Sequence, residues 1–306
     1  MEGGIGACPE RSRTDRHAER SSARSCRQSV APLLAMSEPQ NQKAKTETFR
    51  ALHQGKILIL PNAWDAASAR IIQQAGFPAI ATTSAGIAFT LGYPDGQRIS
   101  REEMLTVVGS IARAVKLPVT ADVEAGYGDR PEDAARTARD VLAAGAVGMN
   151  LEDATGNPQR PLFHPTLQVE RIKAVRELPI VLNARTDVYL LDVGAPEKRY
   201  DEALRRLAAF RDAGADCVFV PGLRDAATIG RLVKDLQCPV NVLVGPGSPP
   251  VPELQKLGVA RVSVGSAAMR ATLGLLRRIA EELKSAGTYA TLEGGISFAD
   301  VNRMME

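Results

Sequence analysis

Short apolar runs alternate with longer amphipathic stretches from residue 56 onward, and no other feature of the chain constrains its fold as strongly. Most of the runs are continuously apolar, as expected of parallel strands covered on both faces. The runs are 57–60, 79–82, 119–121, 147–151, 180–182, 217–220, 240–244 and 261–264. Helical periodicity lies in 64–75, 101–115, 131–144, 166–177, 201–213, 225–236, 251–257 and 266–285. This order predicts an α/β protein with a closed (β/α)₈ TIM barrel.

Turn residues support the same order of elements. Glycines follow the expected helices, and prolines stand at three expected strand starts, where a missing N–H donor is tolerated. They are Gly76, Gly145, Gly214 and Gly258, and Pro118, Pro179 and Pro239. A doubly wound open sheet is the alternative fold. No expected strand leads into a G-x-G-x-x-G or Walker phosphate loop, so that fold's usual ligands would have no cradle.

Residues 1–45 differ in composition from the rest. They are rich in Arg and Ser and show no hydrophobic period, so we expect a disordered extension ahead of a catalytic domain at 46–306. The segment lacks the apolar stretch of a secretory signal, and its acidic residues argue against a transit peptide. Our preferred interpretation is an upstream extension, with Met36 as the true start.

Composition excludes several classes of function. The formal net charge is only +3, and no basic stripe is interleaved with aromatic residues, so we expect no nucleic-acid partner. No apolar run approaches the ~20 residues of a membrane helix, so we expect no membrane partner. The 4 cysteines form no C-x-x-C pair, which argues against a disulfide framework or a zinc site. This cysteine usage favours a reducing, cytoplasmic location.

Three carboxylates follow the apolar runs at the edge where barrel enzymes carry their active sites. Asp122 and Glu124 are two residues apart after one run, so their side chains can face the same way. Glu152 ends the next run and can join them. Carboxylates at close quarters repel one another unless a cation lies among them, and oxygen ligands suit Mg²⁺. The pattern therefore predicts a magnesium site.

Groups that bind anions follow two other runs. Arg185 offers a positive fork to a substrate carboxylate, and the segment 83–86 offers backbone amides and hydroxyls to a second anionic group. A purely structural network of ion pairs is the alternative for these charges. His53, Cys217 and Cys238 are expected to lie outside the site.

Five motifs in the same order resemble those of one enzyme superfamily. Residues 121–128 (ADVEAGYG) resemble its D-x-D-x-G-[YF]-G signature, 151–153 (LED) its L/I-E-D, and 183–187 (NARTD) its A-R-T-D. Residues 91–95 (LGYPD) and 61–65 (PNAWD) resemble its L-G-x-P-D and P-x-A-x-D segments. Over about residues 45–285 the chain resembles the isocitrate lyase/phosphoenolpyruvate mutase superfamily.

The resemblance implies a (β/α)₈ barrel whose last helix is often exchanged between subunits of a tetramer or dimer. It also implies Mg²⁺ held by Asp122 with Glu124 and Glu152 nearby, and a small carboxylate substrate. The substrate would be bound by Arg185 and the loop Thr83, Ser84 and Ala85, with Asp95 close to that loop. Glu152, Arg185 and Asp95 are then the catalytic candidates. Members make or break a C–C or P–C bond beside an oxo-acid through an enolate held on magnesium.

The chain departs from the superfamily pattern at two places. Position 124 is Glu where most members have Asp. The expected gating loop, residues 154–165, holds neither the K-[KR]-C-G-H element of isocitrate and methylisocitrate lyases nor the Lys-Thr-Asn of phosphonate mutases. Its candidate residues are Gly156, Arg160 and His164. We therefore expect poor cleavage of isocitrate and methylisocitrate.

Three functions remain open from the sequence. The first is a lyase, decarboxylase or hydrolase of an oxaloacetate-like or substituted malate-like acid. The second is a P–C bond mutase or hydrolase. The third is a barrel that binds a dicarboxylate without turnover, against which the intact metal and Arg positions argue.

Overall fold

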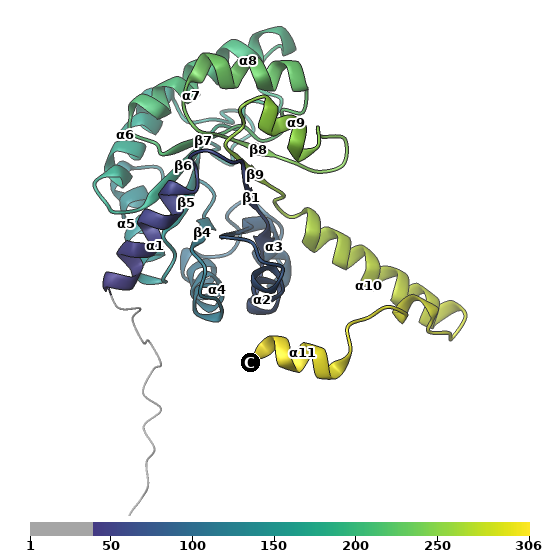
Figure 1. Ribbon diagram of the computed structural model, residues 1–306. Helices are drawn as coiled ribbons and strands as arrows, with labels where there is room; N and C mark the ends of the chain where they lie inside the picture. Colours follow the sequence, from purple (N-terminus) through teal and green to yellow (C-terminus); the bar gives the residue numbers. More distant parts are fainter. Residues whose placement is uncertain (1–38) are drawn as a thin grey trace, which may run out of the picture. The chain divides into compact units, whose positions relative to one another are not determined.

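The strands of the computed structural model, which describes residues 39–306, are all parallel and belong to one sheet (Figure 1). They are β1 (Leu58–Leu60), β2 (Asn62–Ala63), β3 (Ile80–Thr82), β4 (Val119–Asp122), β5 (Gly148–Glu152), β6 (Val181–Arg185), β7 (Cys217–Phe219), β8 (Val240–Leu243) and β9 (Arg261–Ser263). Each of the eight apolar runs overlaps one of these strands, and β2 continues the first run.

The sheet curves into a nearly closed barrel because β1 and β2 are two halves of one strand. β1 pairs with β9 and β2 pairs with β3, so the two halves join the ends of the sheet. Only Pro61, which has no N–H to donate, separates them. The (β/α)₈ barrel predicted from the sequence is confirmed.

The side chain of Asn62 fastens this junction. Its Oδ1 accepts hydrogen bonds from the N–H groups of Val264 and Gly265, both at 2.9 Å. Its Nδ2 donates to the carbonyl of Thr82 at 2.7 Å. One buried side chain thereby joins the exits of the first, second and last strands of the barrel.

The eight helices expected from periodicity are present. They are α2 (Ala66–Gln74), α4 (Arg101–Ala114), α5 (Pro131–Ala143), α6 (Pro165–Arg176), α7 (Arg199–Asp212), α8 (Ala226–Leu236), α9 (Val251–Lys256) and α10 (Ala267–Ser285). The main apolar core lies between these helices and the strands. The sequence did not predict α1 (Pro39–Ala51), α3 (Ser84–Thr90) or α11 (Phe298–Met305).

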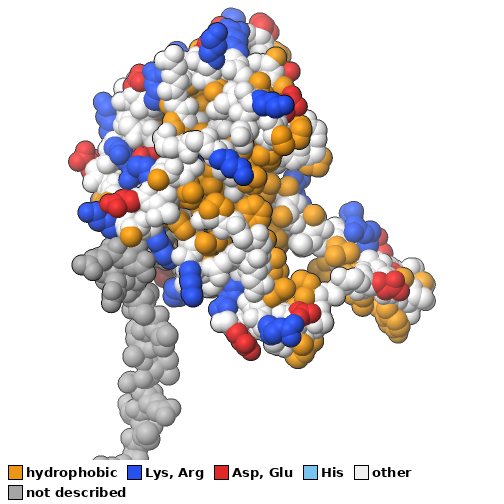
Figure 2. Space-filling model, in the orientation of Figure 1, with side chains coloured by type: hydrophobic (Ala, Val, Ile, Leu, Met, Phe, Trp, Pro, Cys, Tyr) orange, Lys and Arg blue, Asp and Glu red, His pale blue; other side chains and the backbone are white. Residues whose placement is uncertain are grey.

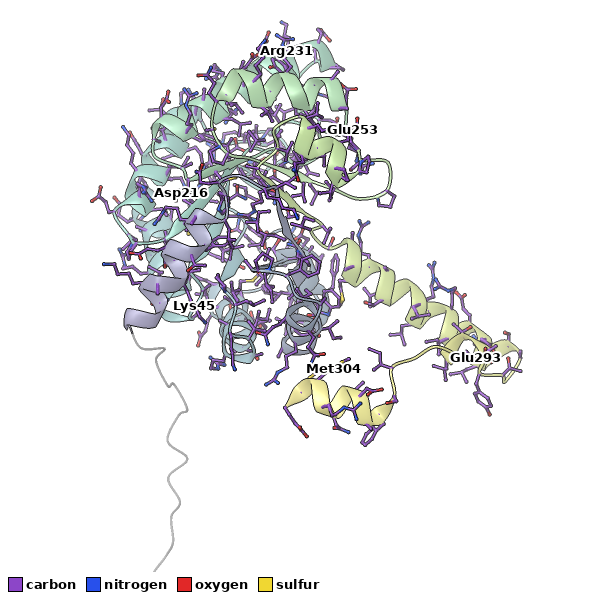
Figure 3. The ribbon with its side chains drawn as sticks, viewed as in Figure 1. Lys45, Asp216, Arg231, Glu253, Glu293 and Met304 are labelled. Atoms are coloured by element: carbon purple, nitrogen blue, oxygen red, sulfur yellow. The ribbon has the colours of Figure 1, made fainter. Side chains whose placement is uncertain are left out.

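Helix α1 corrects the expected start of the folded domain. It begins at Pro39, so residues 39–45, which the sequence assigned to a disordered extension, are helical. Gln42 Nε2 donates to the carbonyl of Leu142 at 2.6 Å, and Arg50 forms an ion pair with Asp216 (labelled in Figure 3) at 2.9 Å. The helix escaped notice because it carries few apolar residues. The rest of the extension, with Met36, lies outside the described residues.

Phe49 of α1 fills the floor of the barrel. It is fully buried against apolar side chains of the strands, and its ring meets that of His53 edge-on at 5.0 Å. A Cβ at residue 148 would lie 2.8 Å from the Phe49 ring, so the close approach requires Gly148. His53, as expected, lies at this end and not at the mouth.

The C-terminal segment exposes apolar side chains. Met269 is the one buried residue of α10, whereas Leu276 and Phe298 are 60% and 86% exposed. Figure 2 shows this apolar surface along the segment that ends the chain. Arg70 of α2 donates to the carbonyl of Met304 in α11 at 3.4 Å. Within residues 39–306, no helix has the length and apolar character needed to cross a membrane.

Candidate active site

Asp122 ends β4 at the mouth of the barrel and is held by its neighbours. Its Oδ2 accepts from the backbone N–H of Ser84 at 3.2 Å and from the Ser84 hydroxyl at 3.0 Å. Its Oδ1 accepts from Asn150 Nδ2 at 3.2 Å. The carboxylate is 9% exposed, so these contacts fix it at the edge of solvent where a ligand can reach it.

The predicted substrate-binding segment begins a short helix. Thr83 caps α3, its Oγ1 accepting from the N–H of Gly86 at 3.3 Å. Ser84 directs both of its donors to Asp122, and Ala85 is buried. The structure therefore brings this segment to the predicted metal ligand.

Glu124 ties the mouth to the segment that follows α3. Its Oε2 accepts from the N–H of Gln97 at 2.6 Å, and Gln97 Oε1 accepts from the N–H of Tyr127 at 2.8 Å. Glu124 has a φ of +52°, a left-handed conformation that is rare outside glycine. Burial, together with the charges of Asp95 and Asp122, raises the pKa of Glu124 to about 8. Sequence reasoning missed Gln97, which belongs to no motif.

Asp95 lies on this tied segment and is itself exposed. Partial burial of its carboxyl group and the nearby charge of Asp122 raise its pKa, and Arg185 opposes the shift. The charge of Asp95 is thus affected by Asp122 and Arg185 at the mouth.

Arg185 at the end of β6 is already engaged by two carboxylates. Its Nη1 lies 2.8 Å from Oε2 of Glu152. Its Nε and Nη2 lie 2.5 and 2.9 Å from the two carboxylate oxygens of Asp187. The two hydrogen bonds to Asp187 use Nε and Nη2, and the ion pair with Glu152 uses Nη1. The guanidinium of Arg185 is thus held in a fixed position at the mouth.

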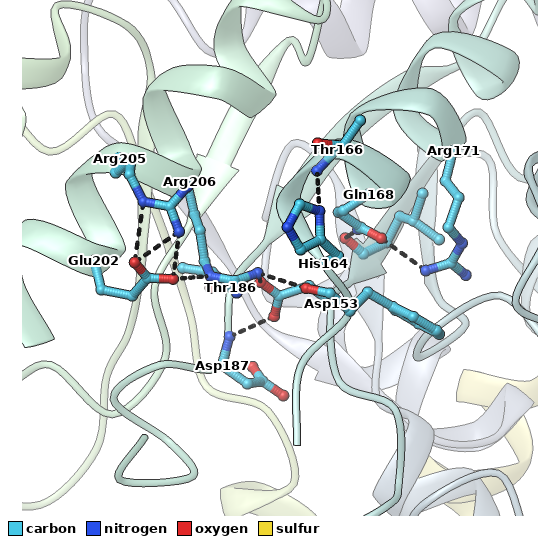
Figure 4. Close-up of polar contacts among 12 residues, drawn as sticks. Asp153, His164, Thr166, Gln168, Arg171, Thr186, Asp187, Glu202, Arg205 and Arg206 are labelled. Carbon is cyan, nitrogen blue, oxygen red and sulfur yellow. Dashed lines mark hydrogen bonds and ion pairs between the residues drawn. The ribbon is translucent and has the colours of Figure 1, made fainter. Parts of the chain in front are cut away.

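Glu152 is buried at the same point. Burial raises its pKa well above the usual range, and the Arg185 charge only partly opposes this. Asp153, the next residue, is fully buried and hydrogen-bonded to Thr186, the N–H of Asp187 and Arg206 (Figure 4). Burial raises the pKa of Asp153 to about 6, against the opposing charge of Arg206. Arg206 belongs to no motif, so sequence reasoning missed it.

The gating loop folds back on itself. Ala154 and Leu162 form an antiparallel bridge, and the N–H of Thr155 donates to Pro161 at 2.9 Å. Gly156 and Arg160 lie exposed near its tip, and a cavity of about 510 Å³ separates the loop from residues 191–194. His164 caps α6, with Nδ1 3.4 Å from the N–H of Thr166, so it does not point from the tip as a free acid.

The donor chemistry at the mouth fits a hard cation bound mainly through water. Across residues 39–306, no three His, Cys, Asp or Glu side chains are arranged to hold a metal directly. All three carboxylates are already engaged: Asp122 by Ser84 and Asn150, Glu124 by Gln97, and Glu152 by Arg185. The buried Oε1 of Glu124 finds no partner in the described part of the chain, and a nearby cation would offset its charge. Mg²⁺ commonly keeps several waters and few protein ligands.

A parallel (β/α)₈ barrel with carboxylates and a fixed guanidinium at the carboxyl ends of adjacent strands defines the class of TIM-barrel enzymes. A family model described as phosphoenolpyruvate phosphomutase matches residues 49–284. The chain belongs to the phosphoenolpyruvate mutase/isocitrate lyase superfamily, and it is an enzyme of this superfamily of C–C lyases and mutases.

Two relatives illustrate the range of similarity. An uncharacterized Mycobacterium tuberculosis protein is 35% identical over 79% of this chain and 92% of its own length. The 2-methylisocitrate lyase of Escherichia coli is 27% identical over 73% of this chain and 79% of its own.

Two crystal structures match the fold. A Burkholderia cenocepacia protein, whose description leaves lyase and mutase open, matches with a TM-score of 0.81 and 42% identity over 86% of this chain and 96% of that one. An oxaloacetate acetylhydrolase in complex with its product oxalate matches with a TM-score of 0.76 and 26% identity, over 86% of this chain and 94% of that one.

Proposed function

We propose that this enzyme makes or breaks a C–C bond beside a 2-oxo carboxylate, with Mg²⁺ as cofactor and through an enolate. Its substrate is an oxaloacetate-like or substituted malate-like acid. The observation that carries the proposal is the meeting of Asp122, Glu152 and Arg185 at the ends of three adjacent strands. The oxalate complex of the related acetylhydrolase supports a small dicarboxylic acid as ligand.

The proposed roles follow from the contacts. Asp122 would hold Mg²⁺, directly or through water, with Glu124 and Glu152 nearby. When bound, Mg²⁺ polarises the 2-oxo group and offsets the negative charge that develops on it. Arg185 binds the substrate carboxylate, beside the segment Thr83, Ser84 and Ala85, in which Ser84 donates to Asp122. Asp95 shields the mouth on its tied segment.

A P–C bond mutase or hydrolase is the second candidate. The matching family model, described as phosphoenolpyruvate phosphomutase, favours it. The gating loop lacks the Lys-Thr-Asn element that the mutases carry there, which weighs toward C–C chemistry.

We also propose that the enzyme is a homo-oligomer, a tetramer or dimer, in which α10 packs against a second copy. The exposed leucines of α10 and the exposed Phe298 support this arrangement. The cytoplasmic location expected from the cysteine usage also remains a proposal, supported by the free thiols of Cys217 and Cys238.

A substrate screen tests the proposed function. Purified enzyme is incubated with oxaloacetate, 2,3-dimethylmalate or phosphonopyruvate, with Mg²⁺ or with EDTA. Release of pyruvate, CO₂, oxalate and phosphate is followed. We expect turnover of one of the first two acids, lost with EDTA and restored by Mg²⁺. Turnover of phosphonopyruvate alone would establish the second candidate instead, and metal-independent turnover would contradict the role of Mg²⁺.

A further inference from the structure

Arg206 on α7 reaches under the mouth with one buried guanidinium. Its Nη1 lies 3.1 Å from Oδ2 of Asp153 and 2.9 Å from the carbonyl oxygen of Phe163. Its Nε donates to Oε1 of Glu202, one turn earlier on the same helix, at 2.6 Å. Arg206 and Asp153 are 7% and 0% exposed, so water does not compete for these bonds.

Asp153 also accepts hydrogen bonds from the residues that directly follow Arg185 at the end of β6. Its Oδ2 accepts from the Thr186 hydroxyl at 2.7 Å, and its Oδ1 accepts from the N–H of Asp187 at 3.0 Å (Figure 4). Thr186 and Asp187 directly follow Arg185. The backbone position of Asp187 decides where its own carboxylate stands, and that carboxylate grips Arg185 through two nitrogens. A continuous chain of bonds therefore runs from Arg206 to Arg185.

The same nitrogen of Arg206 also fixes the returning arm of the gating loop. Besides its carbonyl bond to Arg206, Phe163 donates its N–H to the carbonyl of Asp153 at 2.8 Å. Its ring lies under the guanidinium of Arg171 at 4.3 Å. Arg171 in turn donates to the carbonyls of Ala125 and Gly128, in the loop that follows Asp122. Phe163 is thus held from both sides of the mouth.

We propose that Arg206 is a positioning residue that holds Arg185 in its binding orientation and couples it to the returning end of the gating loop. The inference adds a positioning residue to the proposed function and depends on that function only for the ligand measurement below. Arg206 itself does not contact the substrate. It acts through Asp153 and Asp187.

Charge burial explains why the effect reaches Arg185. Without Arg206, the Asp153 carboxylate would stay buried without its counter-charge, a costly state for an ionised group. Water entry or a shift of the Asp153 side chain would relieve it, and either change loosens the bonds to residues 186 and 187. The carbonyl of Phe163 would lose its partner at the same time.

Hydrogen exchange tests this coupling without any ligand. We compare wild type with Arg206→Met, Arg206→Lys and the control Arg205→Met. Arg205 pairs with the same Glu202 at 2.8 Å, but its side chain is 57% exposed. In Arg206→Met, peptides that cover Phe163 and Asp187 should exchange at least about fivefold faster, while those that cover β8 and β9 change less than about twofold. The control should match wild type.

Arg206→Lys keeps the positive charge beside Asp153 and should recover part of the protection. If Arg206→Met does not fold, Arg206→Lys decides by the same comparison, with faster exchange expected in the same two peptides. Wild-type protection of both peptides in the substituted protein, or a loss of equal size in Arg205→Met, would overturn the proposal.

Calorimetric titration with oxalate and Mg²⁺ tests the effect on Arg185. The dissociation constant should rise at least about tenfold in Arg206→Met but less than about twofold when Arg185→Lys is already present, because the two residues act in series. Equal losses in both backgrounds would show a merely structural role and overturn the inference. If wild type binds no oxalate, the proposed ligand class is wrong, and the exchange measurement still decides the role of Arg206.

Discussion

Arg185 and Glu152 stand opposite one another on paired strands, and Nη1 of Arg185 lies 2.8 Å from Oε2 of Glu152. The proposed anchor for a substrate carboxylate therefore lies against a buried acid, and Asp187 holds it from the other side. The planar guanidinium contacts both carboxylates at once. An ammonium group cannot reproduce this geometry.

Replacing Arg185 with Lys keeps the charge but loses the fork. We expect kcat/KM to fall about 10- to 150-fold, which corresponds to the loss of about 1.5–3 kcal/mol expected for a charged hydrogen bond. Steady-state kinetics on the substrate found in the screen measures the loss. The matched control is Arg205→Lys, on an exposed part of α7, which should leave kcat/KM unaltered. Wild-type kinetics in Arg185→Lys would rule out its anchoring role.

Replacing Asp122 with Asn should weaken Mg²⁺ binding at least about tenfold, because the site loses its proposed anionic ligand. Asn nearly preserves the size of the side chain, and its amide oxygen can still accept from Ser84, although the contact with Asn150 is lost. Calorimetric titration with Mg²⁺ measures the change, and Asp129→Asn, outside the proposed set, is the control. Unchanged affinity in Asp122→Asn would show that the metal binds elsewhere.

His53 should make the fold sensitive to mild acid. Burial, followed by the charge of Arg261, lowers its pKa to about 4 from an ordinary 6.5. Between these two values the unfolded chain binds a proton that the folded protein refuses, so stability falls as the pH drops. From pH 7 to pH 4.5 this contributes a loss of about 2–3 kcal/mol.

Urea unfolding at pH 7 and pH 4.5 measures this dependence. His53→Gln keeps a donor for the Phe49 carbonyl but cannot titrate, so the wild-type protein should lose about 2–3 kcal/mol more than the variant on acidification. Equal losses of unfolding free energy in the two proteins would show that protonation of His53 does not cause the acid sensitivity.

Methylisocitrate should be cleaved poorly, although relatives carry the name 2-methylisocitrate lyase. The gating loop supplies no Cys, Lys or Tyr, and its His164 serves as the cap of α6. Incubation with 2-methylisocitrate and Mg²⁺, followed by a pyruvate assay, provides the check. Robust pyruvate formation that His164→Ala abolishes would contradict this and identify His164 as the acid.

Much of the fold was predictable because burial on both faces leaves a readable trace. The apolar runs overlap the strands, and the helices between them carry amphipathic periodicity. Helix α3 escaped prediction because it is short and nearly all buried, so it shows no polar face. Helix α1 escaped for the opposite reason, since it is mostly polar and docks through Phe49, the hydrogen bond of Gln42 and the ion pair of Arg50.

The candidate site also has one part that the sequence predicted and one part that it did not. Asp122, Glu152 and Arg185 follow strands directly, so topology brings them together. The contacts that hold them come from elsewhere. Gln97 reaches Glu124 through a backbone N–H, and Arg206 reaches Asp153 across 53 residues of sequence. Neither contact follows from strand order, because each depends on how a loop or helix settles against the barrel.

The two bonds from Asn62 to Val264 and Gly265 join positions 202 and 203 residues apart. A ribosome makes the middle strands, with Asp122, Glu152 and Arg185, long before it makes the last strand. Until then the edges of β1 and β8 have no partner, and an open edge of this kind invites pairing with other chains. The side chains of the proposed site are therefore synthesised before the barrel can close. Formation of the Asn62 hydrogen bonds to Val264 and Gly265 closes the sheet and ends the period in which its open edges favour aggregation.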